Sequence, residues 1–318
     1  MSRCIFNPEH DLCLASGEEN FIPPASVQTF AAKGNWIEKY MSVPQAYPFA
    51  VMPWGWNSCI KKKLLVEGYT ADKLPPDSFL NFIREHSRRE LAVDLLDSMQ
   101  GESIIPSSYR MVARSLEDIE SFVQQKGRIV LKSPLSGSGK GIRFVCGELM
   151  ETDRGWCRRT LQKQGAVIVE ERKEVVQECA MLFECGGEVK FRGYSMFYAH
   201  NGAYKGNLLA SDGYIETIVG EYINVDELRQ CRDRILEFLQ ERLQGRYWGY
   251  VGVDQFIFAE GGKYLLNPAV EINLRMTMGL IARNIYDCHA AEFHLGEATH
   301  CFEPHVGVVG VNIVGLKS

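Results

Sequence analysis

Hydrophobic and polar positions divide the chain into two parts with different patterns. Before about residue 103, short apolar runs are interrupted by prolines and aromatic residues. A short helical stretch is predicted after the break at residues 22–26, and further helices are predicted after Pro75-Pro76-Asp77 and over 88–99. From residue 104 onward, apolar runs of strand length alternate with apolar stripes at helix spacing. This alternation predicts α/β architecture for the larger, second part.

The second part begins with a helix and a pair of strands. Ser115 and Asp118 form a capping pair that predicts the start of a helix. An apolar strand over 129–132 then leads into a glycine-rich loop over 136–141, and another strand follows over 142–146. The order predicts a strand, loop and strand rather than a loop that opens a helix.

Later segments predict further strands and helices. Two long strands, 177–184 and 188–198, are separated by Gly186-Gly187, which is a good hairpin signal. An apolar stripe after Asn224 predicts a helix that ends at Gly245. The remaining predicted elements are a helix over 156–164 and strands over 166–171, 250–258, 264–274 and 306–314.

Composition excludes several classes of function. A chain of 318 residues predicts about two domains, and 46% hydrophobic with 24% charged residues is typical of globular proteins. The net charge of -5 shows no basic excess, which argues against a nucleic-acid partner. Ten scattered cysteines without a C-x-x-C pair predict reduced thiols and disfavour zinc. No apolar leader or membrane-spanning run is apparent, so we expect a cytoplasmic protein with no membrane partner.

Three oxygen-bearing side chains are expected to meet near the C-terminus. Glu271 and Asn273 are two residues apart on one predicted strand and project from the same face, and Asp254 lies on the neighbouring strand. Burying this set without a cation would be costly. Mg²⁺ prefers such ligands together with phosphate oxygens. The cluster therefore predicts a site for one or two Mg²⁺ ions. In the alternative interpretation, these residues form the polar outer face of a sheet.

A phosphate-binding segment is predicted upstream. Lys132 ends an apolar strand beside the glycine-rich loop that contains Ser138, Gly139 and Lys140. Backbone N–H groups and a lysine ammonium can bind phosphate oxygens. The loop is not a Walker P-loop, because Pro134 stands where that motif needs glycine. An exposed hairpin turn is the alternative.

Three more acids and one arginine are candidates for substrate contacts. Glu170 and Glu171 end a buried strand and could close an adenine pocket, and Glu178 on the next strand is the stronger candidate for a ribose ligand. Arg192 could bind a substrate carboxylate with two hydrogen bonds, and segment 204–209 could line the acceptor pocket. Solvated strand ends and a surface arginine are the alternatives.

Taken together, these motifs and their order along the chain resemble the pattern of the ATP-grasp superfamily. The resemblance covers about Arg88 to Met278. The resemblance implies an α/β (α+β) chain with the ATP-grasp fold, in which two lobes grip ATP. It implies an N-terminal pre-ATP-grasp α/β domain over 1–103, a small lobe with a glycine-rich flap over 104–172, and a C-terminal lobe with the metal site over 173–318.

The resemblance also implies a role for each matching residue. Lys132 would hold α- and β-phosphate oxygens, Glu170 and Glu171 would form the adenine hinge, and Glu178 would bind ribose. Arg275 would steady the γ-phosphate and the acyl phosphate that forms from it. The flap would contain Ser138, Gly139 and Lys140, and the Mg²⁺ ligands would be Asp254, Glu271 and Asn273.

Two segments depart from the family pattern. The stretch 265–271 is longer than usual, so Asn267 could take the position assigned to Glu271 if a bulge formed at Pro268. The order Glu-x-Asn-x-Arg favours Glu271. The segment 7–11, Asn-Pro-Glu-His-Asp, matches no mechanism, and a polar turn is preferred to a substrate contact.

The implied activity is that of an ATP- and Mg²⁺-dependent ligase. It would join a small-molecule carboxylate to an amine (or a thiol) through an acyl phosphate. An ATP-dependent small-molecule kinase on the same fold and a non-catalytic nucleotide-binding regulatory protein are the alternatives. The sequence does not indicate the substrates, and a homodimer is compatible with the architecture.

Overall fold

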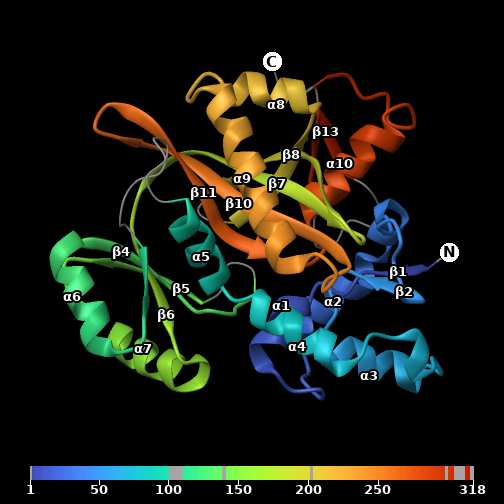
Figure 1. Cartoon of the computed structure of the whole chain (residues 1–318), viewed down its shortest axis with the longest axis horizontal. Coiled ribbons are helices and arrows are strands. Elements are labelled where there is room, and N and C mark those ends of the chain that lie inside the picture. The colour runs from blue at the N-terminus through green and yellow to red at the C-terminus, as the bar shows by residue number, and fades with distance from the viewer. Residues whose placement is uncertain are drawn as a thin grey trace.

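The computed structural model describes residues 2–99, 110–137, 141–200, 203–297, 300–303 and 312–315. Three β-sheets organise this part of the chain, with two, four and seven strands. Figure 1 shows the four-stranded sheet at one end of the molecule, beside the long β10–β11 hairpin of the seven-stranded sheet. No helix in the described part combines the length and apolar character needed to cross a bilayer.

The N-terminal region is mainly helical around a short parallel sheet, in which β1 (Arg3–Ile5) pairs with β2 (Val51–Pro53). Helix α4 (Asp77–His86) begins directly after Pro76, as predicted, and α5 (Glu90–Ser98) covers most of the predicted helix over 88–99. The other elements of this region are α1 (His10–Ser16), α2 (Ala25–Lys33), η1 (Asn35–Tyr40), α3 (Ser58–Val66) and η2 (Ala71–Lys73).

The four-stranded sheet is antiparallel and has the order β3-β6-β4-β5. Helices α6 (Leu116–Lys126) and α7 (Glu151–Gln164) pack on it around a separate hydrophobic core (Figure 1). The predicted capping box at Ser115 and Asp118 is present, and α7 starts five residues earlier than predicted. The strands are β3 (Arg110–Ala113), β4 (Arg128–Lys132), β5 (Ile142–Cys146) and β6 (Val167–Glu171).

The seven-stranded sheet has the order β11-β10-β7-β8-β9-β12-β13. The predicted hairpin at Gly186-Gly187 joins its strands β7 and β8, which confirms that prediction. Of the predicted strand over 306–314, residues 306–311 lie outside the described residues. The strands are β7 (Glu174–Cys185), β8 (Val189–His200), β9 (Ala203–Leu209), β10 (Gly249–Glu260), β11 (Lys263–Asn273), β12 (His300–Phe302) and β13 (Ile313–Gly315).

Three helices accompany this sheet: α8 (Asp212–Val219), α9 (Val225–Leu243) and α10 (Met278–His289). Asn224 is the N-cap of helix α9, which buries the predicted apolar stripe. The Asn224 side chain accepts a hydrogen bond from the backbone N–H of Asp226. All ten cysteines are free thiols.

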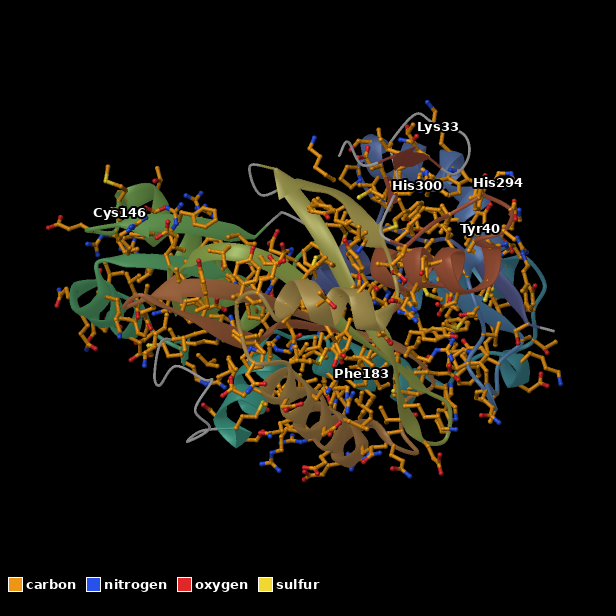
Figure 2. All side chains as sticks on the ribbon, turned by 90° about the horizontal axis from the view of Figure 1, so that it is seen from above. Lys33, Tyr40, Cys146, Phe183, His294 and His300 are labelled. Atoms are coloured by element: carbon orange, nitrogen blue, oxygen red, sulfur yellow. The ribbon has the colours of Figure 1, made fainter. Side chains whose placement is uncertain are left out.

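The N-terminal region and the seven-stranded sheet share one hydrophobic core, which contains Leu14 and Ile60 together with Phe183 and Val251. A backbone hydrogen bond from Met276 to Trp54 (2.8 Å) joins the two parts directly. In Figure 2, Phe183 lies within the body of the molecule and Cys146 lies at the far end of the four-stranded sheet. The shared core fixes the N-terminal segment against the strands that carry the predicted metal ligands.

Candidate functional site

The four polar residues predicted near the C-terminus meet at one end of the β10–β11 hairpin. Asp254 lies directly opposite Glu271 in the strand register. The Asn273 amide donates to Asp254 Oδ2 at 3.0 Å, and Arg275 Nη2 donates to Asn273 Oδ1 at 2.9 Å. The sequence spacing therefore located a real three-dimensional cluster.

Electrostatics in this cluster favour binding of a cation. Burial, and then the neighbouring charge of Glu271, raise the pKa of Asp254 to about 7, although Arg275 and Asn273 oppose the rise. Two like charges held on adjacent strands disfavour ionisation of both. A divalent cation between them would offset this repulsion.

The residues present fit Mg²⁺ better than a metal with an all-protein ligand set. Within the described residues, no three or more His, Cys, Asp or Glu side chains are arranged so that they alone could hold a metal ion. Mg²⁺ needs only one or two carboxylates when phosphate oxygens and water supply the rest. The Asn273 oxygen accepts from Arg275, so the amide would have to turn before that oxygen could face an ion.

A β-bulge decides between Glu271 and Asn267 as the partner of Asp254. Asp254 pairs with Glu271 and Phe256 pairs with Asn267, so residues 268–270 lie opposite Gln255 alone. Gln255 Nε2 donates to the Pro268 carbonyl at 2.9 Å, and the fully buried Asn267 side chain accepts from the Ala269 backbone. The extra residues around Pro268 thus return Glu271 to the position opposite Asp254.

The N-terminal segment 7–11 is part of this site and is not merely a polar turn. Asp11, in the first turn of α1, accepts from Arg275 Nε at 2.8 Å. The neighbouring His10 is buried beside Gly55 and Asn57, and burial lowers its pKa to about 4. The dense run of polar residues at 7–11 is the sequence signal for this contact, but it matches no family spacing.

Arg89 is a second site residue that sequence reasoning missed. It is buried at the start of α5 and donates to Glu271 Oε2 at 3.0 Å and to Ser136 Oγ at 2.9 Å. It therefore connects the base of the glycine-rich loop to the carboxylate cluster. An arginine at a helix N-terminus opposes the helix dipole, and this local conflict is the signal that could have identified it.

Lys132 and Glu170 form a buried ion pair within the four-stranded sheet. The Lys132 ammonium lies 2.7 Å from Glu170 Oε2, and Arg110 Nε lies 3.0 Å from Glu170 Oε1. Burial lowers the pKa of Lys132, and the charges of Arg110 and Lys132 outweigh burial to lower the pKa of Glu170. Arg110 also donates to the Ala269 carbonyl at 2.7 Å, two residues before Glu271. This chain of contacts links the two predicted lobes.

The other residues predicted to contact the nucleotide lie in different surroundings. Glu171 forms ion pairs at 3.3 Å with Lys126 and Lys173, so its carboxylate is engaged. Glu178 lies on the same face of β7 as Ala180, and burial raises its pKa. The predicted flap residues Ser138, Gly139 and Lys140 lie outside the described residues.

Arg192 is not brought to the cluster. It is the extra residue of a bulge in β8, since Phe191 pairs with Phe183 and Gly193 with Leu182. Its side chain is 43% exposed and lies 3.5 Å from Glu184.

A cavity of about 350 Å³ opens beside Asp254 and Arg275. The N-terminal region contributes Asp11 and Trp54 to its wall, and Tyr204 and Asn207 come from the segment predicted to line an acceptor pocket. The cavity therefore joins the N-terminal region to the predicted metal ligands.

Comparison with known proteins reveals similarity in structure only. No family model and no curated protein matches the sequence. The biotin carboxylase domain of a 2-oxoglutarate carboxylase from Hydrogenobacter thermophilus, solved with MgADP, ADP and bicarbonate, matches with a TM-score of 0.52 and 10% identity over 90% of this chain and 69% of that chain. The chain therefore has the ATP-grasp fold, as predicted.

Two further solved structures are similar over most of this chain. An N5-carboxyaminoimidazole synthetase from Staphylococcus aureus, complexed with ADP, matches with a TM-score of 0.47 and 14% identity over 91% of this chain and 66% of that chain. An N5-carboxyaminoimidazole ribonucleotide synthetase from Thermus thermophilus matches with a TM-score of 0.47 and 15% identity over 97% of this chain and 80% of that chain. The chain thus spans just under two thirds of the Staphylococcus aureus enzyme.

Proposed function

We propose that this protein is an ATP- and Mg²⁺-dependent ligase that joins a small-molecule carboxylate to an amine (or a thiol) through an acyl phosphate. The observation that carries the proposal is the convergence of Asp254, Glu271, Asn273 and Arg275 beside a cavity able to hold a small molecule. The ATP-grasp fold, and the MgADP bound to the similar biotin carboxylase domain, support it.

The nucleotide would bind between the predicted lobes, 104–172 and 173–318, which follow an N-terminal domain over 1–103. When the nucleotide binds, the Lys132 ammonium would leave its ion pair with Glu170 and bind α- and β-phosphate oxygens. Glu178 would accept a hydrogen bond from the ribose. The backbone next to Glu170 and Glu171 would contact adenine, because both carboxylates are held in ion pairs. Ser138, Gly139 and Lys140 would cover the β- and γ-phosphates.

Mg²⁺ would be held by Asp254, Glu271 and, after its amide turns, Asn273. When bound, it would neutralise charge on the transferring phosphoryl group. Arg89 and Arg275 are the nearest protein cations to this cluster in the described structure and would stabilise the same charge.

The reaction would proceed in two balanced steps. A carboxylate oxygen of the substrate attacks the γ-phosphorus, and the bond to the β–γ bridging oxygen breaks with its electrons left on ADP. The amine nitrogen then attacks the acyl carbon, phosphate departs, and the nitrogen loses a proton to give the amide. Arg275 would position the carboxylate and steady the acyl phosphate, so catalysis would rest on orientation and charge stabilisation.

Calorimetric titration with a non-hydrolysable ATP analogue, with and without Mg²⁺, tests the nucleotide site. Binding should depend on Mg²⁺ and should be lost in Lys132→Ala. A coupled assay then identifies the chemistry, since a ligase releases phosphate only when carboxylate and amine are both present, whereas a kinase yields a phosphorylated product. Absence of analogue binding to the wild-type protein would overturn the proposal.

A further inference from the structure

The cavity beside Arg275 has its charged groups at one end only. Asp11, Asp254 and Arg275 are the only charged side chains that line it within the described residues. The rest of the wall includes Trp54 and Phe197, together with Phe30, Pro8 and Met278. A ligand that fills this space therefore has one ionic end and an apolar body.

The charged end can bind a carboxylate. Within the described residues, Arg275 donates from Nε to Asp11, from Nη1 to the Met276 carbonyl and from Nη2 to Asn273. A guanidinium has five N–H donors, so two remain. They belong to the two terminal nitrogens, which together can bind a carboxylate with parallel hydrogen bonds.

A hydrogen-bonding group interrupts the apolar wall. Asn207 is 1% exposed and Ser195 is 4% exposed, and the Asn207 amide donates to Ser195 Oγ at 2.8 Å. Tyr204 donates to the Asn207 oxygen, which fixes the orientation of the amide. Because Ser195 Oγ accepts this bond, its own proton can be donated to a ligand.

Gly279 lets the start of α10 pack closely against Ser195. A Cβ atom at this position would lie 2.7 Å from Ser195 Oγ and 3.0 Å from its Cβ. Gly279 has no positive φ angle, so space and not backbone conformation requires the glycine. Gly279 and Ser195 thus form adjoining parts of the cavity wall, where the Ser195 hydroxyl can meet an oxygen of the substrate.

We infer that this cavity binds the carboxylate substrate, and that this substrate is a small acid with an aromatic or apolar body carrying one hydrogen-bond acceptor. The carboxylate faces Arg275, the body packs between Trp54 and Phe197, and the acceptor reaches Ser195. A second carboxylate or a phosphate on the body would have no cation to meet in the described wall. The inference rests on the proposed ligase function and specifies its substrate class.

Ligand-observed NMR on the protein loaded with Mg²⁺ and the non-hydrolysable analogue tests this class. The probes are 3-(4-hydroxyphenyl)propanoate, 3-phenylpropanoate and succinate. We expect affinity to decrease in that order, and ATP-dependent trapping of the acyl phosphate by hydroxylamine to follow the same order. Equal or tighter binding of succinate, or no binding of the aromatic acids, overturns the substrate class. Loss of analogue binding would instead overturn the proposed function.

Variants of the cavity wall test which side chains contact the probes. Ser195→Ala should remove the advantage of the hydroxyl-bearing probe and leave 3-phenylpropanoate unchanged. Phe197→Leu should weaken both aromatic acids about tenfold, whereas Phe144→Leu, at a 65% exposed position on β5, should not. An unchanged preference in Ser195→Ala, with analogue binding intact, would contradict the placement of the acceptor.

Discussion

Asp11 and Arg275 form a partly buried ion pair at 2.8 Å although 264 residues separate them in the chain. Burial alone would raise the pKa of Asp11, but the charges of Arg275 and His10 and the hydrogen bond from Arg275 together outweigh burial and lower that pKa. The N-terminal region therefore does more than precede the two predicted lobes. It fixes the orientation of the arginine that faces the cavity.

Asp11→Asn should lower kcat about 10- to 100-fold, because a neutral amide holds the guanidinium less firmly than a carboxylate does. Binding of the ATP analogue should be nearly unchanged, since Asp11 is a positioning residue. Steady-state kinetics and calorimetry on the same variant measure the two effects.

The exposed Asp77, which pairs with Lys61, offers a matched control. Asp77→Asn should leave kcat unchanged. Partial rescue by Asp11→Glu would support an effect of charge, and loss of analogue affinity equal to the loss of kcat would contradict the positioning role.

The predictable parts of the fold are those encoded by local patterns. The capping box at Ser115 and the Gly186-Gly187 hairpin follow from a few neighbouring residues, and the structure confirms both. The cluster around Glu271 was also predictable, because residues two apart on a strand share a face. Bulges, by contrast, depend on pairing with other strands.

Long-range contacts explain what the sequence did not reveal. Arg192 lies beside Glu184 and away from the cluster, whereas Arg89 reaches Glu271 across 182 residues. The contact between Asp11 and Arg275 likewise depends on the shared core that packs the N-terminal region on the large sheet. No local pattern specifies such contacts.

Asp254 should make stability and Mg²⁺ binding depend on pH in opposite directions. Its pKa rises from an ordinary 3.8 to about 7 on folding, so between these values the folded protein holds a proton that the unfolded chain has released. Its contribution to the free energy of unfolding is complete below about pH 4 and is lost as pH rises towards 7. Mg²⁺ affinity should instead increase over this range, because the ion requires the carboxylate.

Thermal unfolding of wild type and Asp254→Asn at pH 5 and pH 8 measures this contribution. The Tm of wild type should fall relative to that of the variant as pH rises, and Mg²⁺ with the ATP analogue should reduce the difference at pH 8. Parallel pH profiles for the two proteins would show that Asp254 titrates normally.

The buried pair of Lys132 and Glu170 couples nucleotide binding to stability. Lys132→Met should abolish analogue binding and lower the free energy of unfolding by about 3 kcal/mol, because Glu170 loses one of its two close cations. The double variant Lys132→Met/Glu170→Gln should recover part of this stability without recovering binding. Urea unfolding and calorimetry test the two statements separately, and equal stability of both variants would argue against a costly unpaired charge.

Glu271→Gln distinguishes the two candidates for the second metal ligand. The change should abolish Mg²⁺-dependent turnover while the protein stays folded, since an amide can still accept from Arg89. Asn267→Ala, in the bulge, should lower stability because the buried side chain accepts from the Ala269 backbone, yet its folded fraction should retain Mg²⁺ dependence. Turnover measured against Mg²⁺ concentration, with folded fraction determined by circular dichroism, compares the variants. Full activity of Glu271→Gln, together with lost Mg²⁺ dependence in Asn267→Ala, would show that Asn267 is the second metal ligand.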